Sequence, residues 1–290
     1  MYQRLPATLL LILLLFAPLT GCSNGVRYIF NASSDSRGLP TEVGLAFEEV
    51  WFPTSDGLSL HGWYLPGRRP GPLLFYCHGN AANISYRLDI LDYFHARLGL
   101  PVFIFDYRGY GNSAGAAMAE SDLYVDARGA LAYLEGRGWQ PAQMVYFGRS
   151  LGAAIALQMA LEQPPAGLVL ESAFTSLRDI ARRLRPVSYT LFGSWLLGSA
   201  YDNLAKIEQL RVPLLIIQGS KDPIVPAEMS ARLYARAPQP KQRVLMPGAG
   251  HSDSFRVAER AYGEAWDGFL ATLPVAANPA PPSQSDLSRL

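Results

Sequence analysis

Short apolar segments of strand length alternate with longer segments of helical periodicity along most of this 290-residue chain. The first two apolar segments flank Thr54–Gly57, whose polar and glycine residues predict a hairpin turn. Because strands and helices alternate after this hairpin, the pattern predicts an α/β fold with a mostly parallel sheet of eight strands and helices on both faces. The predicted strands are 46–53, 58–65, 72–77, 102–106, 144–147, 167–170, 214–218 and 243–246, and the predicted helices are 84–98, 121–136, 151–162, 227–237 and 255–273.

The N-terminal residues do not follow this alternation. An apolar run from Leu9 to Phe16 follows Arg4 and is too short to span a bilayer, so residues 1–21 are predicted to be a signal peptide. The run ends in Leu19–Cys22, which resembles the lipobox of bacterial lipoproteins. This resemblance implies cleavage before Cys22 and lipidation of that residue, and an ordinary secretory signal or an uncleaved anchor with an incidental Cys22 is the alternative.

Lipidation would tie the mature chain to a membrane through Cys22, in the bacterial cell envelope and facing the periplasm. Ser23 follows, rather than the aspartate that resembles an inner-membrane retention signal, which favours the outer membrane. Residues 22–43 are rich in Ser, Asn, Asp and Gly and are predicted to be a tether to a domain spanning 44–273. The Pro-, Ser- and Ala-rich residues 274–290 are predicted to be disordered.

Charge and cysteine content narrow the function classes. The chain carries 25 Lys and Arg against 24 Asp and Glu, and no basic stripe suggests nucleic acid as a partner. Besides Cys22 there is one cysteine, Cys77, in a strand-like run, so a buried free thiol is expected. No metal-binding cluster or cofactor motif is visible, and we expect neither a metal nor a cofactor.

The clearest chemical motif is Gly148–Gly152, in which Ser150 lies between a predicted strand and a predicted helix. Glycines on both sides remove the Cβ atoms that would clash where a strand turns sharply into a helix, so the pattern predicts an exposed nucleophile at the tip of this turn. Gly111–Gly115 matches the same pattern, but its Ser113 lies seven residues beyond a strand with no helix directly after it. We therefore interpret Ser113 as loop sequence.

A serine nucleophile needs a base, and the base needs an acid. Of the four histidines, only His251 lies in a glycine-containing loop after the last predicted strand. Asp222, after the strand 214–218, is the predicted acid, with Asp253 and Asp202 as rivals. The chain order of Ser150, then Asp222, then His251 is the one expected for an α/β-hydrolase sheet.

Two backbone N–H groups should stabilise the oxyanion of the tetrahedral intermediate. Leu151 supplies one at the predicted helix start, and the loop after strand 72–77 is predicted to supply the other at Asn80. This loop is also compatible with a simple strand-to-helix turn capped by Asn83. Asp106 is predicted to be structural, accepting backbone N–H groups and pairing with Arg108.

Together, six segments resemble the α/β-hydrolase superfamily, and most closely its Bem46-like branch, often grouped with the serine aminopeptidases S33. The resemblance covers about residues 47–273 and implies the triad and the oxyanion donors Asn80 and Leu151. The branch includes esterases, thioesterases and lipases, so the resemblance does not specify a substrate. The segments are 78–83, 106–113, 148–152, 171–177, 218–226 and 248–253.

Residues 176–210 interrupt the alternation where this fold carries its lid. Aromatic and aliphatic side chains there, with Phe192, Trp195 and Leu196 at their centre, are predicted to line an acyl pocket. The segment also holds a basic cluster that either meets an anionic head group or membrane surface or is simply solvated. The cluster consists of Arg178, Arg182, Arg183 and Arg185.

The predicted function is a serine hydrolase that cleaves the carboxylic ester or thioester of a small or lipid-like acyl substrate through an acyl-enzyme. The alternatives are a serine peptidase of S33 type and a non-catalytic lipoprotein domain that binds a ligand. Acyl length, head group and oligomeric state are not specified by these patterns.

Overall fold

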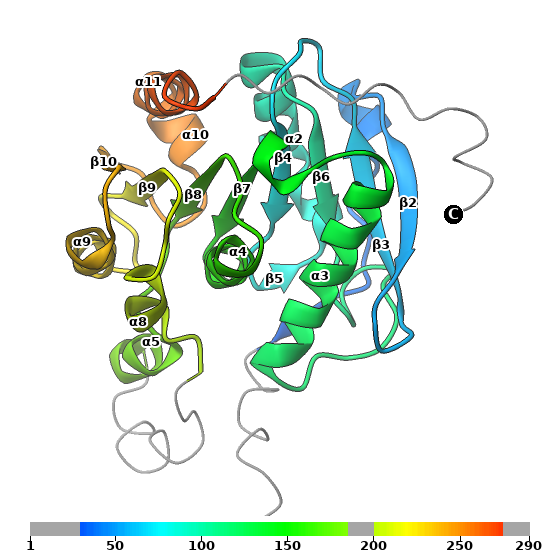
Figure 1. The fold of residues 1–290 in the computed structure, drawn as a ribbon, viewed down its shortest axis with the longest axis horizontal. Coiled ribbons are helices and arrows are strands. Elements are labelled where there is room, and N and C mark those ends of the chain that lie inside the picture. The colour runs from blue at the N-terminus through cyan, green and yellow to red at the C-terminus, as the bar shows by residue number, and fades with distance from the viewer. Residues whose placement is uncertain (1–29, 185–199, 275–290) are drawn as a thin grey trace, which may run out of the picture.

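The computed structural model describes residues 30–184 and 200–274. Eight strands form one sheet, which Figure 1 shows at the centre of the molecule. They are β2 (Glu48–Pro53), β3 (Ser59–Leu65), β4 (Leu73–Cys77), β6 (Val102–Phe105), β7 (Met144–Arg149), β8 (Gly167–Glu171), β9 (Leu214–Gly219) and β10 (Lys241–Met246). Their order across the sheet is β10-β9-β8-β7-β4-β6-β3-β2, with β3 antiparallel to both of its neighbours and the other pairs parallel. The predicted fold class is confirmed.

Helices cover both faces of the sheet (Figure 1). One face packs against α3 (Glu120–Gly136), α4 (Leu151–Glu162), α8 (Asn203–Ile207) and α9 (Ala227–Arg236). The other packs against α2 (Leu88–Tyr93), α10 (Ser254–Val257) and α11 (Glu259–Leu270). A short helix, α5 (Leu177–Leu184), follows β8 and begins the segment predicted as a lid.

The central strands are apolar throughout because both of their faces are buried. In β4, Phe75 and Cys77 enter the core layer that contains α4, whereas Leu74 and Tyr76 enter the layer that contains α11. This alternation follows from successive side chains pointing to opposite faces of a strand. Cys77 is a buried free thiol, as expected, and burial raises its pKa.

The predicted helix 84–98 has three parts. A 3-10 turn covers Ile84–Arg87, α2 follows, and a π-helical turn over Phe94–Leu98 ends at Gly99, which has φ +66°. Asn83 starts this segment, because its Oδ1 accepts a hydrogen bond of 2.9 Å from the N–H of Ser85. The alternative role of Asn83 as a helix cap is thus confirmed.

The predicted tether, residues 22–43, is wrong for residues 30–43. Residues 30–43 lie on the domain, where β1 (Asn31–Ala32) pairs in parallel with β5 (Ala81–Ala82) and Pro40–Val43 forms a 3-10 turn. Some polar groups of this segment bond to the domain, among them the N–H groups of Asn31 and Arg37, which donate to the side chains of Asn80 and Ser85. The predicted signal peptide, Cys22 and the C-terminal tail lie outside the described residues, and so does most of the predicted lid, residues 185–199. No helix in the described ranges is long and apolar enough to cross a bilayer.

Candidate active site

Ser150 occupies the turn between β7 and α4 in a strained backbone conformation. Its φ is 55° and its ψ is −115°, values that a non-glycine residue adopts only when its surroundings enforce them. The N–H of Ser150 donates a 2.9 Å hydrogen bond to the carbonyl of Glu171, and its carbonyl accepts one of 3.0 Å from Ala153. The turn is therefore fixed from both sides of the serine.

The two glycines of the motif are required by close backbone contacts. A Cβ at Gly148 would lie 2.3 Å from the carbonyl oxygen of Gly152, and a Cβ at Gly152 would lie 2.0 Å from that of Cys77. No side chain fits at such distances. The prediction that both glycines permit the sharp turn is thus explained by the approach of α4 to β7 and β4.

His251 and Asp222 are directly hydrogen-bonded. Nδ1 of His251 lies 2.8 Å from Oδ2 of Asp222, whose side chain is only 1% exposed. The other carboxylate oxygen accepts bonds of 2.9 Å from the N–H groups of Ile224 and Val225. Burial alone would raise the pKa of Asp222, but the hydrogen bond from His251, its charge and these N–H groups together lower it. Asp222 is therefore held as a carboxylate that orients the imidazole.

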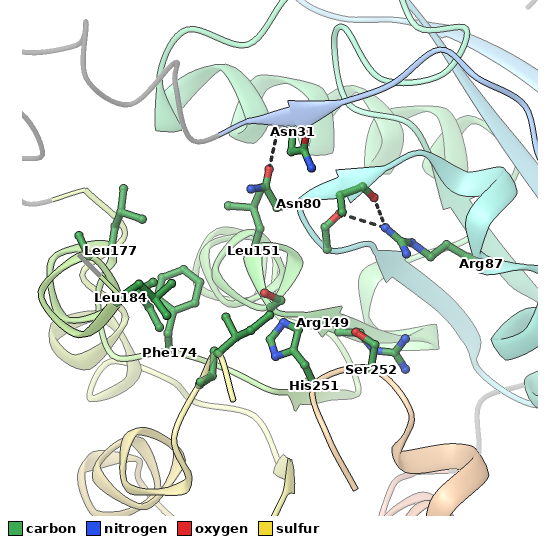
Figure 2. Close-up of a pocket in the computed structure, with 17 residues that line it drawn as sticks. Asn31, Asn80, Arg87, Arg149, Leu151, Phe174, Leu177, Leu184, His251 and Ser252 are labelled. Carbon is green, nitrogen blue, oxygen red and sulfur yellow. Dashed lines mark hydrogen bonds between the residues drawn. The ribbon is translucent and has the colours of Figure 1, made fainter. Parts of the chain in front are cut away.

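A cavity of about 640 Å³ brings the predicted site residues together. Ser150, His251, Leu151 and Asn80 all line it, and Figure 2 shows the last three around the same space. The opposite wall is apolar and comes mainly from α5 and the loop after β9. It consists of Phe174, Leu177, Ile180, Ala181, Leu184, Ile224 and Val225.

The loop after β4 lies against the serine turn. Gly79 approaches it so closely that a Cβ there would contact the Arg149 carbonyl at 3.4 Å and Ser150 Cβ at 3.6 Å. Nδ1 of the preceding His78 lies 2.7 Å from the Gly79 carbonyl, which can only accept, so Nδ1 carries the proton. Burial, together with the charge of Arg87, lowers the pKa of His78 to about 3. His78 is thus a neutral, buried support of the loop.

The rival residues have structural partners. Asp253 accepts a hydrogen bond of 2.6 Å from the N–H of Gly250, and Asp202 caps α8 by accepting one from Ala205. Ser113 is buried, donating to the Asp106 carbonyl and accepting from the N–H of His61. None of the three lines the cavity formed by the described residues.

One prediction is wrong, and several predicted residues lie outside the described chain. Asp106 accepts a hydrogen bond from the N–H of Ile84, as expected, but Arg108 does not pair with it. Arg108 instead bonds Asp126 and Asp56, because its side chain crosses from the loop to α3 and the hairpin. The predicted pocket residues, and the predicted lipidation site, cannot be placed in the structure because they fall in residues 185–199 and 1–29; they are Phe192, Trp195, Leu196 and Cys22.

The sequence motifs did not predict a buried ion pair next to Ser150. Nη2 of Arg149 lies 2.9 Å from Oε2 of Glu171, and the Tyr262 hydroxyl donates to the same oxygen at 3.0 Å. The neighbouring Ser172 hydroxyl donates a 2.9 Å bond to the carbonyl of His251. The available signal was a glutamate at the end of a fully apolar strand, because a charge in that position requires a buried partner.

Groups of three or more metal-ligating side chains do not occur within residues 30–184 and 200–274. The arrangement that is present can perform nucleophilic chemistry: a strained serine and a histidine oriented by a carboxylate share one cavity with a helix N-terminus.

The sheet order, the serine turn between β7 and α4 and the following Asp222 and His251 loops define an α/β hydrolase. Solved structures agree on the fold. An esterase from Pyrococcus furiosus superposes with a TM-score of 0.68 at 19% identity, covering 84% of this chain and 98% of that one. An esterase from Exiguobacterium antarcticum gives a TM-score of 0.59 at 17% identity, covering 78% and 100%.

Sequence comparison identifies the family of the chain. It belongs to the family described as serine aminopeptidase, S33, which it matches over residues 68–205 and 192–253. It is 40% identical to an uncharacterised protein of Mycobacterium tuberculosis, over 86% of this chain and 88% of the relative. It is 31% identical both to the α/β-hydrolase domain-containing protein WAV2 of Arabidopsis thaliana, covering 77% and 78%, and to protein bem46 of Schizosaccharomyces pombe, covering 74% of each chain.

Proposed function

We propose that this protein is a serine hydrolase that cleaves a carboxylic ester or thioester. Ser150 attacks the acyl carbonyl while Nε2 of His251 takes its proton, and Asp222 stabilises the imidazolium through Nδ1. The N–H groups of Leu151 and Asn80 donate hydrogen bonds that stabilise the oxyanion. His251 then returns the proton to the leaving group, and water hydrolyses the acyl-enzyme by the same route.

The observation that carries this proposal is the 2.8 Å bond between His251 and Asp222 in a loop pair that shares a cavity with the strained Ser150. A domain that only bound a ligand would need neither the strain at Ser150 nor a buried carboxylate behind the histidine.

The charges around the cavity favour an ester over the free amino terminus of a peptide. The described residues that line the cavity include no aspartate or glutamate, but they include two arginines, Arg87 and Arg149. Arg149 is paired with Glu171, but within the described residues Arg87 forms no ion pair and donates to the carbonyls of Gly79 and Ala81. A substrate ammonium group would find no counter-charge among these described lining residues and would meet a guanidinium.

Labelling with a fluorophosphonate tests the nucleophile. We expect the wild-type protein to be labelled and Ser150→Ala to lose both the label and about 10⁵-fold or more of ester turnover. Ser113→Ala is the matched control, because Ser113 belongs to the second glycine–serine motif and should keep its label. Labelling of Ser150→Ala would show that another residue is the nucleophile.

A substrate panel separates the reaction types. p-Nitrophenyl esters of two to twelve carbons, acyl thioesters and aminoacyl-p-nitroanilides should be compared at equal enzyme concentration. We expect turnover of esters or thioesters at least about 100-fold above the anilides. Faster anilide hydrolysis would support the S33 peptidase alternative, and no turnover in any arm together with no labelling would support a non-catalytic domain.

We also propose that Cys22 carries lipid and ties the protein to the bacterial envelope, with the catalytic domain facing the periplasm and the outer membrane preferred. The support is the Leu19–Cys22 sequence after an apolar run. Metabolic labelling with an alkyne palmitate tests this. The label should appear on the mature chain that begins at Cys22 and be lost in Cys22→Ala, whereas Cys77→Ala, which changes the buried thiol, should keep it.

A further inference from the structure

The N-terminal residues 30–37 lie across the loop that carries Asn80. Beyond the pairing of β1 with β5, the N–H of Asn31 donates a 3.1 Å hydrogen bond to the side-chain oxygen of Asn80, which is drawn in Figure 2. The carbonyl of Ser33 accepts a bond of 2.9 Å from the Asn83 side-chain amide. The N–H of Arg37 donates to the Ser85 hydroxyl at 2.9 Å. One short segment thus contacts the loop at its start, its middle and its end.

The motif 106–111 holds the same loop from inside the fold. The Tyr107 hydroxyl donates a 2.9 Å hydrogen bond to the carbonyl of His78, and the Tyr110 hydroxyl donates one of 2.8 Å to the side-chain oxygen of Asn80. Oδ1 of Asp106 accepts from the N–H of Ile84 at 2.9 Å. The motif and the N-terminal segment are themselves joined, because the N–H of Gly111 donates to the Ser33 carbonyl at 3.0 Å.

The Asn80 side chain is where the two supports meet. Its Oδ1 accepts from both the Asn31 N–H and the Tyr110 hydroxyl, while its backbone N–H is the one assigned to the oxyanion. On the other side of the loop, Arg87 bonds the carbonyls of Gly79 and Ala81 (Figure 2). The Gly79 carbonyl belongs to the same peptide group as the N–H of Asn80, and it also accepts a hydrogen bond from Nδ1 of His78. The bonds to this carbonyl therefore help to fix the direction of the Asn80 N–H, and the bond to the Ala81 carbonyl holds the next part of the loop.

We propose that residues 30–37 and Tyr110 are positioning elements of the oxyanion hole, acting through the Asn80 side chain. The inference rests on the proposed hydrolase function. An oxyanion donor lowers the barrier only when it already points at the place where charge develops, so a small rotation of the loop costs rate. Substrate binding depends on it much less, because the ground-state carbonyl gains little from that donor.

Tyr110→Phe is the sharpest test, because it removes one hydroxyl from a fully buried ring and keeps the shape. We expect kcat for p-nitrophenyl butyrate to fall about tenfold with KM within twofold, when rates are expressed per fluorophosphonate-titrated site. Affinity for a trifluoromethyl ketone that mimics the tetrahedral intermediate should fall by the same factor. Tyr146→Phe is the control, since the Tyr146 hydroxyl is buried without a hydrogen-bond partner among the described residues. The kcat of this variant should match that of the wild type.

Two truncations test the N-terminal segment. A chain that begins at residue 30 keeps the segment and should keep kcat, whereas one that begins at residue 38 should lose about 10- to 100-fold in kcat per titrated site. A synthetic peptide of residues 30–37, added to the shorter chain, should restore part of the loss. Full kcat in the chain that begins at residue 38 would overturn the role of the segment.

The outcomes separate the two proposals. Equal kcat in Tyr110→Phe and Tyr146→Phe, with wild-type labelling intact, overturns the positioning role and leaves the hydrolase function standing. Absence of both turnover and labelling in the wild-type protein overturns the hydrolase function itself. If the chain that begins at residue 38 fails to fold, the tyrosine pair still decides the matter.

Discussion

The two walls of the cavity are built in different ways. The catalytic wall consists of backbone turns and buried polar groups, each with hydrogen-bond partners: the Ser150 turn, the His251–Asp222 pair and the loop of Asn80. The apolar wall consists of side chains from α5 and the loop after β9. Two of these are substantially exposed, Leu184 at 47% and Ile224 at 39%.

The difference fits the roles that we propose for the two walls. Proton transfer and oxyanion stabilisation require atoms held to within fractions of an ångström, which in this fold is achieved by burying the polar groups and pairing them. Contact with an acyl chain requires apolar area and no fixed geometry. Changes in the catalytic wall should therefore lower kcat or stability, and changes in the apolar wall should affect KM for particular substrates.

After the loss of Ser150 itself, the largest effect is expected at Asp222. In Asp222→Asn the amide can no longer stabilise the imidazolium or hold the required tautomer of His251, so kcat should fall about 10³- to 10⁴-fold. Asp253→Asn is the matched control. It changes a carboxylate two residues from His251 that only supports the N–H of Gly250, and it should cost less than about tenfold. Ester kinetics on both variants make the measurement, and the reverse ranking would make Asp253 the acid.

Glu171→Gln should cost about 3–5 kcal/mol in the free energy of unfolding, because it leaves the buried guanidinium of Arg149 without a counter-charge. Glu162→Gln removes the partner of Arg128 in a pair that is partly exposed, and should cost less than about 1 kcal/mol. Denaturant unfolding gives both values. Similar losses in the two variants would mean that the support behind the catalytic wall is no stronger than a surface pair.

The buried His78 should make the free energy of unfolding of the protein depend on pH. Its pKa is about 3 in the folded protein and near 6.5 in an unfolded chain, so between these values the unfolded state binds more protons and stability falls as pH falls. At pH 5 this loss is about 2 kcal/mol relative to pH 8. His78→Asn keeps a donor for the Gly79 carbonyl and removes the titration. Its stability should change less than that of the wild type between these pH values, and parallel curves would disprove the burial effect.

The smallest effect is expected in the apolar wall. Leu184→Ala should raise KM for a p-nitrophenyl octanoate about 3- to 10-fold and leave the acetate within twofold, because only a longer acyl chain reaches α5. Leu245→Ala truncates a leucine of similar exposure, 44%, that does not line the cavity. It should change neither value. A loss of kcat for both esters in Leu184→Ala would show that the two walls are mechanically coupled.

Local features of the sequence were sufficient for the sheet and for selecting Ser150, Asp222 and His251 as candidates. Strand and helix periodicities, the glycines at 148 and 152 and the order of Ser150, Asp222 and His251 are all encoded in short stretches. The structure gives each a local reason, because the clash distances at the two glycines and the direct bond between His251 and Asp222 arise where strands end side by side. Their chemical roles stay predictions until the variants are measured.

Long-range pairings were not predictable from such stretches. A segment rich in Ser, Asn and Asp reads as a tether by composition, yet residues 30–37 find hydrogen-bond partners 48 or more positions away. Arg108 sits two residues from Asp106 but pairs with Asp56 and Asp126, since the neighbours of a loop side chain depend on which elements pack around it. The sequence favoured Asp222 over Asp202 and Asp253 by its place after a strand, and only the folded structure shows that the two rivals bond to the N–H groups of Ala205 and Gly250.

The sequence by itself thus determined the architecture and the candidate residues Ser150, Asp222 and His251, because periodicity and glycine positions act over a few residues and the order of the strands follows the chain. Only the tertiary structure decided what surrounds that chemistry: the buried pair of Glu171 and Arg149, the neutral His78, and the N-terminal segment against Asn80. The physical reason is that burial and pairing of polar groups depend on which elements pack together. The distance between two residues along the chain does not show whether they meet in the fold.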